Sequence, residues 1–272
     1  FLAPATFLIA VFSFWPMIKA LVLSFQTGKG RNMQMAGFTN YIRMFQDDVF
    51  IQSIKNTFFY FILQVPIMLV VALVLACILN KKDLRFKGFF RTMIFVPCTT
   101  SLVAYSIIFR SLFANNGLVN YVLVNIGILD KPYNFLTQPF AAKMVILLGL
   151  LWRWTGYNMV FFLSGLQNIE YSVYEAAKID GSGEAACFLY ITLPNLLSSF
   201  FTITVISLIN SFKVYREAYL VAGDYPDQSI YMMQHLFNNW FLDLSLDKLA
   251  VGAVINTAIF VVLIWGFWKG WG

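Results

Sequence analysis

The sequence contains few charged residues and a single histidine. Charged side chains make up 12% of the 272 residues, whereas about 25% is usual for a soluble domain. The three cysteines, Cys77, Cys98 and Cys187, have no CxxC spacing, so we expect them to be reduced residues that pack in the interior. Walker A, dinucleotide-binding and HExxH sequences are absent, and the acidic residues are not paired in the apolar runs. The usual residues for nucleotide, zinc or intramembrane acid–base chemistry are therefore missing.

Apolar side chains, in contrast, are abundant, at 60% of the chain. Runs of about 20 apolar residues fit transmembrane helices, whereas barrel strands would alternate. We predict an all-α membrane protein with one transmembrane domain over residues 1–272. Its six spans lie at about 1–25, 53–79, 92–112, 140–166, 196–221 and 249–268. A cleaved signal peptide is the alternative for the first run, which however lacks an Ala-x-Ala exit. Because the chain begins at Phe1 rather than Met, we expect a preceding segment.

Loop charges predict how the spans are oriented. Five basic residues lie between positions 81 and 91, and the positive-inside rule places such a loop in the cytoplasm. Residues 223–247 contain four Asp and neither Lys nor Arg, as expected for an outside loop. Both termini are then cytoplasmic. Anionic lipid headgroups are a more plausible partner for the basic loop than nucleic acid. Four further cations are expected to reach the outer membrane surface: Lys19, Lys55, Arg110 and Lys143.

A polar segment at residues 167–195 interrupts the apolar chain on the predicted cytoplasmic side. Ser172 and Glu175 have capping-box spacing, so a helix is expected to begin at Ser172. Residues 180–183, Asp-Gly-Ser-Gly, should end it, and a second helix is expected over about 182–190. Glu175 could also serve only as a cap, and Gly181 only as a turn. The pattern predicts a protruding helix–turn–helix that docks onto another protein.

The same segment resembles the EAA signature of permease subunits of binding-protein-dependent ABC importers. The matching residues are Glu175, Ala176, Ala177, Asp180, Gly181, Ile191, Leu193 and Pro194. Residues 37–41 and 211–217 are similar to the carbohydrate-uptake, MalF-like branch. Ser182 and residues 223–226 depart from the common pattern.

The resemblance implies a type I importer permease fold in a bacterial plasma (inner) membrane, with a cytoplasmic coupling helix at the EAA segment. It also implies a second, MalG-like permease, two ATPase subunits that bind ATP and Mg, and an extracytoplasmic solute-binding protein. The chain itself would be a transport subunit without an ATPase site and would need no cofactor.

The resemblance further implies that sugars pass along the middle of the third to fifth spans. Aromatic rings can stack on sugars, and amides and hydroxyls can exchange hydrogen bonds with them. The candidates are Thr100, Ser101, Trp152, Arg153, Trp154, Gly156, Tyr157, Asn158, Asn210, Ser211 and Lys213, with Asn256 in the sixth span. Arg153 and Lys213 suggest an acidic, uronate-type oligosaccharide, although cations bonded to helix-end carbonyls would look identical. A polyol or glycerol phosphate permease, an intramembrane enzyme and a structural scaffold are the alternatives.

Overall fold

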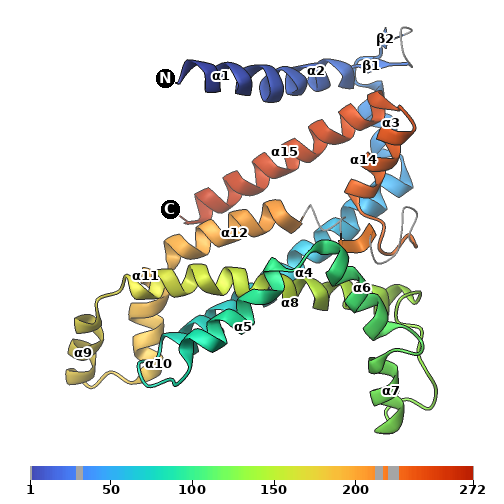
Figure 1. The fold of residues 1–272 in the computed structure, drawn as a ribbon. Coiled ribbons are helices and arrows are strands. Elements are labelled where there is room, and N and C mark those ends of the chain that lie inside the picture. Colours follow the sequence, from blue (N-terminus) through green and yellow to red (C-terminus); the bar gives the residue numbers. More distant parts are fainter. Residues whose placement is uncertain (1, 29–32, 212–216, 220–226, 272) are drawn as a thin grey trace. The chain divides into compact units, whose positions relative to one another are not determined.

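The computed structural model describes residues 2–28, 33–211, 217–219 and 227–271, and most of them are helical (Figure 1). The backbone forms two compact units. One comprises Phe1–Thr57 and Asp224–Gly272, and the other comprises Phe58–Gly223. Each unit is described by itself.

The first unit begins with the first predicted span, which is helical over most of its length. It consists of α1 (Ala3–Ile9), a π-helical turn η1 (Ala10–Phe14) and α2 (Trp15–Ser24). Pro4 and Pro16 occupy the first turns of α1 and α2, where a missing N–H is best tolerated. The antiparallel strands β1 (Gln26–Thr27) and β2 (Gln34–Met35) follow, and then the short helix α3 (Thr39–Phe45).

The second span is α4 (Asp48–Asn80), which begins five residues earlier than predicted and continues from the first unit into the second. Asp47 explains the early start, because its Oδ1 accepts hydrogen bonds from the amides of Val49 (2.9 Å) and Phe50 (3.2 Å). An acidic side chain in that position caps a helix N-terminus. Pro66 lies inside α4, as a packed membrane helix can tolerate.

The first unit also contains α14 (Met233–Leu242) and α15 (Leu246–Trp271). α15 covers the sixth predicted span, whereas α14 lies within the segment that we expected to be a loop. The only histidine, His235, belongs to α14 and is fully buried. Its Nδ1 accepts a hydrogen bond from the Met232 amide (3.1 Å), which fixes the start of this helix.

In the second unit, the third predicted span is wrong as a single helix over 92–112. The structure has α5 (Lys87–Thr99) and α6 (Leu102–Phe113), separated by extended backbone at Thr100 and Ser101. Ser101 Oγ accepts a hydrogen bond from the Ala104 amide (3.1 Å) and thereby caps α6. The hydroxyl-rich run thus favours a helix break over a continuous helix, because Ser and Thr side chains satisfy the backbone locally.

The helices α7 (Leu118–Asn125) and α8 (Pro139–Gln167) follow, and α8 covers the fourth predicted span. The polar segment then forms α9 (Tyr171–Ile179), α10 (Glu184–Cys187), a π-helical turn η2 (Phe188–Thr192) and α11 (Leu193–Asn195). The last helix of this unit is α12 (Leu197–Ser211).

Two details of the polar segment differ from the prediction. The helix α9 starts at Tyr171, and Ser172 forms no capping box because its hydroxyl donates to Glu170 Oε2 (3.2 Å). The second helix starts at Glu184 rather than 182 and continues through η2 and α11. The stretch Glu184–Asn195 meets Leu197–Asn210 at a bend of 62°. The predicted end of the fifth span, near residue 221, lies outside the described residues.

Five helical stretches in the described part of the chain are long and apolar enough to cross a membrane. The count is six if the bent pair is one span. One of the five is Leu102–Asn125, which consists of α6 and α7. The predicted third span at 92–112 instead combined parts of α5 and α6.

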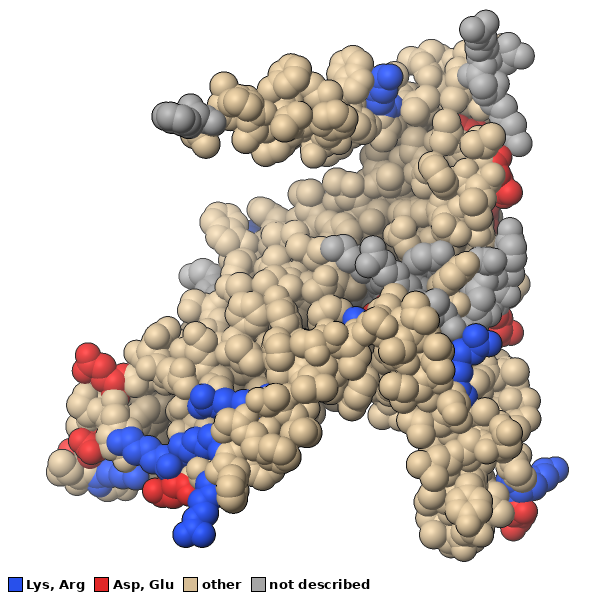
Figure 2. Space-filling model, in the orientation of Figure 1, with Lys and Arg blue, Asp and Glu red and all other residues tan. Residues whose placement is uncertain are grey.

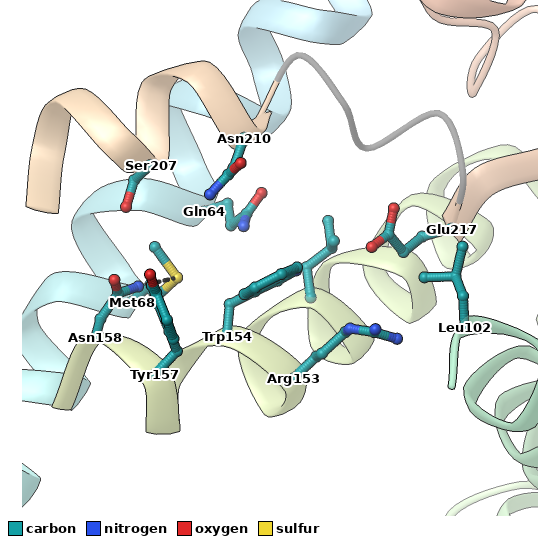
Figure 3. A pocket seen from close by; sticks show the side chains of 11 residues that line it. Gln64, Met68, Leu102, Arg153, Trp154, Tyr157, Asn158, Ser207, Asn210 and Glu217 are labelled. Carbon is teal, nitrogen blue, oxygen red and sulfur yellow. Dashed lines mark hydrogen bonds between the residues drawn. The ribbon is translucent and has the colours of Figure 1, made fainter. Parts of the chain in front are cut away.

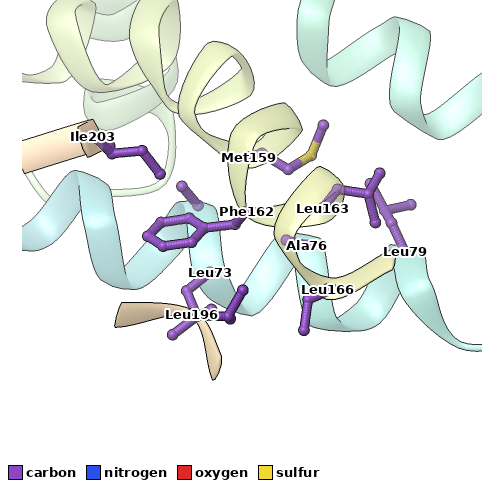
Figure 4. Packing of buried hydrophobic residues seen from close by; sticks show 10 residues of the cluster. Leu73, Ala76, Leu79, Met159, Phe162, Leu163, Leu166, Leu196 and Ile203 are labelled. Atoms are coloured by element: carbon purple, nitrogen blue, oxygen red, sulfur yellow. The ribbon is translucent and has the colours of Figure 1, made fainter. Parts of the chain in front are cut away.

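The core of the second unit lies between α4, α8 and the start of α12 (Figure 4). Ala76 of α4, Phe162 of α8 and Leu196 are fully buried there. Cys77 is half-buried against this cluster, Cys98 is half-buried in α5, and Cys187 is buried in α10. All three thiols are free, as expected for packing residues.

Gly156 allows α8 to approach α5 closely. A Cβ atom at this position would collide with the backbone carbonyl of Ile94 in α5. A backbone atom cannot move aside as a flexible side chain can. The absence of a side chain at residue 156 is therefore a packing requirement of the second unit.

Replacing Gly156 with leucine is expected to destabilise the second unit. Overpacking usually costs about 1–3 kcal/mol, and each kcal/mol lowers the Tm of a domain this size by roughly 2–4 °C. The Tm of the purified, detergent-solubilised complex would measure the effect. Gly266→Leu in α15 is the matched control, because a Cβ there has no neighbour within 4 Å. Equal Tm values for the two variants would contradict the close contact.

Candidate transport cavity and coupling segment

A polar cavity of about 250 Å³ lies within the second unit. One face of α8 supplies five of its lining residues, at spacings that place them on a single helical stripe. The α4 helix contributes two residues one turn apart, and α12 contributes two more (Figure 3). The lining residues are Gln64, Met68, Leu102, Leu150, Arg153, Trp154, Tyr157, Asn158, Ser207, Asn210 and Glu217.

Arg153 is the cation among the described residues that line this cavity. Its side chain is only 8% exposed, and its guanidinium carbon lies 5.6 Å from the Tyr105 ring centroid and 5.5 Å from that of Trp154. Both contacts are within the range of cation–π attraction. Nε and Nη1 of Arg153 have no hydrogen-bond partner among the described residues. Because an unsatisfied buried donor is costly, these N–H groups are suited to a polar ligand or water.

Amide side chains provide further polar groups. Asn158 Nδ2 donates to Met68 Sδ (3.0 Å), a weak acceptor. Gln64 is 4% exposed, and its Oε1 accepts no hydrogen bond within the described chain. Glu217, 5% exposed, brings a carboxylate to the same cavity. Among the described residues, the cavity thus combines donors, acceptors and two aromatic faces with one cationic and one anionic side chain.

The structure brings together five of the predicted path residues: Arg153, Trp154, Tyr157, Asn158 and Asn210. Four others lie elsewhere in the second unit. The Trp152 ring stacks on Tyr105 at 6.3 Å, Gly156 packs against α5, and Thr100 and Ser101 bond to nearby backbone groups. Asn256 belongs to α15 in the first unit and does not line the cavity. Lys213 and the side chain of Ser211 lie outside the described residues.

Sequence reasoning missed Gln64, Met68, Ser207 and Glu217. Gln64 could have been identified from the sequence, because it is an isolated polar residue in the apolar run of α4. Such residues are costly in a membrane and are therefore candidates for function. Glu217 was noted only as part of a resemblance. No local pattern indicates that residues 64, 158 and 217 line one cavity, since that depends on how α4, α8 and residues 217–219 pack.

Gly181 ends α9 in a left-handed conformation with φ of +81°. Its amide donates to the Lys178 carbonyl (3.1 Å), and the Ser182 amide donates to the Ala177 carbonyl (2.9 Å). This pair of bonds is the Schellman arrangement, which glycine favours because other residues are strained at positive φ. The turn between α9 and α10 therefore depends on glycine at position 181.

The α9 helix is mostly exposed, and the Ile179 side chain is 86% exposed. A hydrogen bond between the hydroxyls of Tyr174 and Thr192 (2.9 Å) connects α9 to η2. The other residues of the EAA signature are either exposed or half-buried. Glu175, Ala176, Asp180 and Pro194 are exposed, and Ala177, Ile191 and Leu193 are half-buried. The segment thus presents a rigidly capped helix to solvent, as a docking element requires.

Long apolar helices around a polar cavity, together with an exposed helix on a capped turn, are the features of a membrane transport subunit. The chain belongs to the family of binding-protein-dependent transport system inner membrane components, whose family model matches residues 48–267. It is accordingly a permease component of an ABC importer. The predicted all-α membrane fold of this class and the family resemblance are thereby confirmed.

Relatives and solved structures agree with this assignment. The chain is 48% identical over 219 residues to the lactose transport system permease protein LacF of Rhizobium radiobacter, covering 80% of this chain and 74% of LacF. It is 32% identical over 259 residues to the arabinooligosaccharides transport system permease protein AraP of Halalkalibacterium halodurans, covering 93% and 81%. A bacterial ABC transporter involved in the import of the acidic polysaccharide alginate has the same fold. Its TM-score is 0.86 at 21% identity, with 98% of this chain and 92% of that chain covered.

Proposed function

We propose that this permease takes up a neutral disaccharide or oligosaccharide. The observation that supports this most strongly is the cavity itself, in which Trp154 and Tyr157 lie beside the amides of Gln64, Asn158 and Asn210. Aromatic faces stack on the apolar faces of sugars, while amides bond to hydroxyls. The names of the relatives, which specify lactose and arabinooligosaccharides, support the same substrate class.

An acidic oligosaccharide is the second candidate, and Arg153 is the observation that favours it. A buried guanidinium whose Nε and Nη1 have no partner among the described residues suits a carboxylate. Glu217 lines the same cavity and offsets that charge, so we place the acidic cargo second.

The proposed partners follow from the exposed segment and the family. The α9–α10 turn would dock into an ATPase subunit, so that closure of two such subunits, which bind ATP and Mg, moves this chain and a second permease between inward-open and outward-open states. An extracytoplasmic binding protein would deliver the sugar. In this proposal the chain has no ATPase site or cofactor of its own, the EAA residues make the contact, and both termini are cytoplasmic.

Trp154→Ala is expected to weaken sugar uptake, because it removes a stacking face of the cavity. Aromatic contacts contribute about 0.5–1.5 kcal/mol beyond the area they bury, which corresponds to a roughly two- to tenfold higher KM for uptake. Transport of labelled lactose and arabino-oligosaccharides into vesicles containing the whole complex measures the effect. Trp152→Ala is the matched control, since that ring lies two residues away and outside the cavity. Equal KM values for the two variants would count against the proposed sugar path.

A further inference from the structure

The segment of residues 81–91 concentrates basic and aromatic side chains, of which Lys81, Lys82 and Arg85 are exposed and Lys87 and Arg91 are half-buried. Figure 2 shows Lys and Arg gathered at the end of the second unit that carries α9 and α10. The segment has one acidic residue, Asp83, against five basic ones: Lys81, Lys82, Arg85, Lys87 and Arg91. Phe86, Phe89 and Phe90 are 78%, 58% and 42% exposed. Cations with exposed aromatic rings fit the headgroup region of a membrane that carries negative charge.

The basic segment and the coupling segment are anchored on the same part of the core. Leu84 packs against the buried cluster of α4 and α8, whose members include Leu79 and Leu166. Ile169, just before α9, and Phe188, just after α10, pack against that same cluster. The basic segment and both ends of the coupling segment therefore share one contiguous packed cluster, which provides a physical route between them.

A direct contact also joins the two segments. Lys82 Nζ lies 3.3 Å from the ring centroid of Tyr171, the first residue of α9. Both side chains are exposed, so the cation–π attraction competes with water and with other partners of the ammonium group. The other cations of the segment repel Lys82 unless anions neutralise them. The position of α9 is thus coupled to the charge that surrounds residues 81–91.

We propose that residues 81–91 bind anionic phospholipid headgroups and that this binding, through Lys82 and Tyr171, holds α9 in the orientation that couples to the ATPase. The proposal rests on the proposed function of α9. Anionic headgroups neutralise Lys81, Arg85 and Lys87, so that Lys82 stays on the Tyr171 ring. ATP hydrolysis stimulated by the binding protein then depends on lipid charge.

The test compares the whole complex in vesicles of phosphatidylcholine alone and in vesicles with about one third phosphatidylglycerol. The measured quantity is the ratio of binding-protein-stimulated ATP hydrolysis in the two vesicle types. Because an exposed cation–π contact shifts an equilibrium by roughly two- to fivefold, we expect a ratio of that size for the unmodified complex. High ionic strength should lower the ratio, because salt screens exposed charges.

Two variants test whether the dependence of hydrolysis on lipid charge arises from the basic segment and from Tyr171. Arg85→Gln/Lys87→Gln weakens headgroup binding, and Tyr171→Leu removes the ring while every cation remains. Both are expected to bring the ratio close to one, whereas Lys131→Gln, which removes an exposed cation from the loop before α8, should leave it unchanged.

An unmodified ratio of one, or variants that keep the full ratio, would overturn the proposal. Equal loss of hydrolysis by the double variant in both vesicle types would also overturn it, and would indicate that the segment contacts the ATPase instead. Absence of stimulated hydrolysis by the unmodified complex in either vesicle type would instead contradict the proposed function.

Discussion

Gly181→Leu is expected to reduce sugar uptake by about tenfold or more while the complex stays assembled. A left-handed backbone costs a residue with a side chain about 1–2 kcal/mol, and 1.4 kcal/mol is a tenfold change in an equilibrium. The strain falls on the turn, because a Cβ at position 181 would meet no atom within 4 Å. Leucine therefore leaves the core intact, but it opposes the Schellman bonds that orient α9. Uptake and ATP hydrolysis, measured together in vesicles, should show hydrolysis that no longer drives transport.

Gly183→Leu is the matched control for this experiment. Gly183 is also exposed and also has open space around a Cβ, but its φ of −73° suits any residue. We expect nearly normal uptake from this variant. Asn tolerates the left-handed region better than leucine, so Gly181→Asn should fall between the two. Normal coupling by Gly181→Leu with the ATPase subunits still bound would contradict the assignment of α9.

Arg153→Gln is expected to lower the affinity for transported sugar by about 10- to 100-fold. Hydrogen bonds to charged groups contribute about 1.5–3 kcal/mol, and the guanidinium has two N–H groups without a partner in the described chain. Glutamine keeps a polar side chain but loses the charge and the contacts with Tyr105 and Trp154. The KM for uptake of the same sugar by the unmodified and variant complexes would measure the loss.

Testing Arg153→Gln with both a neutral and an acidic sugar distinguishes the two proposed cargoes. For a neutral sugar cargo, the unmodified complex should transport lactose or an arabino-oligosaccharide, and a uronate oligomer should not compete. For an acidic cargo, the uronate oligomer should be transported, and Arg153→Gln should abolish that transport. Unchanged uptake of both sugar types by Arg153→Gln would show that the cavity residue does not contact the cargo.

The long spans and most of the α8 contribution to the cavity were predictable from the sequence. The runs that become α4, α8 and α15 are continuous and apolar, so composition alone defines them. Arg153, Trp154, Tyr157 and Asn158 recur at helical spacing, and one face of a long helix must carry them together. Trp152 and Gly156 lie in the same stretch, but Trp152 stacks on Tyr105 and Gly156 packs against α5. Helical spacing alone did not show that these two residues lie outside the cavity.

Features that depend on packing between helices were not predictable. The break at Thr100 and Ser101 falls inside the predicted span 92–112, and the sequence did not reveal it because hydroxyls can either bond within a helix or cap a new one. Gln64 and Glu217 join the cavity only through the packing of helices distant in sequence. Gly181 was identified from its spacing, whereas its positive φ and the two bonds that require glycine became evident only in the structure.

Photo-cross-linking from position 179 tests the central claim most directly, namely that α9 docks onto an ATPase that drives transport through this chain. Ile179 is 86% exposed on α9, and a photoreactive amino acid there should reach any docked protein. We predict a cross-link to a nucleotide-binding subunit in the assembled complex, and none from the control position Ile126, which is 61% exposed after α7. A transport-competent complex in which position 179 forms no cross-link to that subunit would contradict the account.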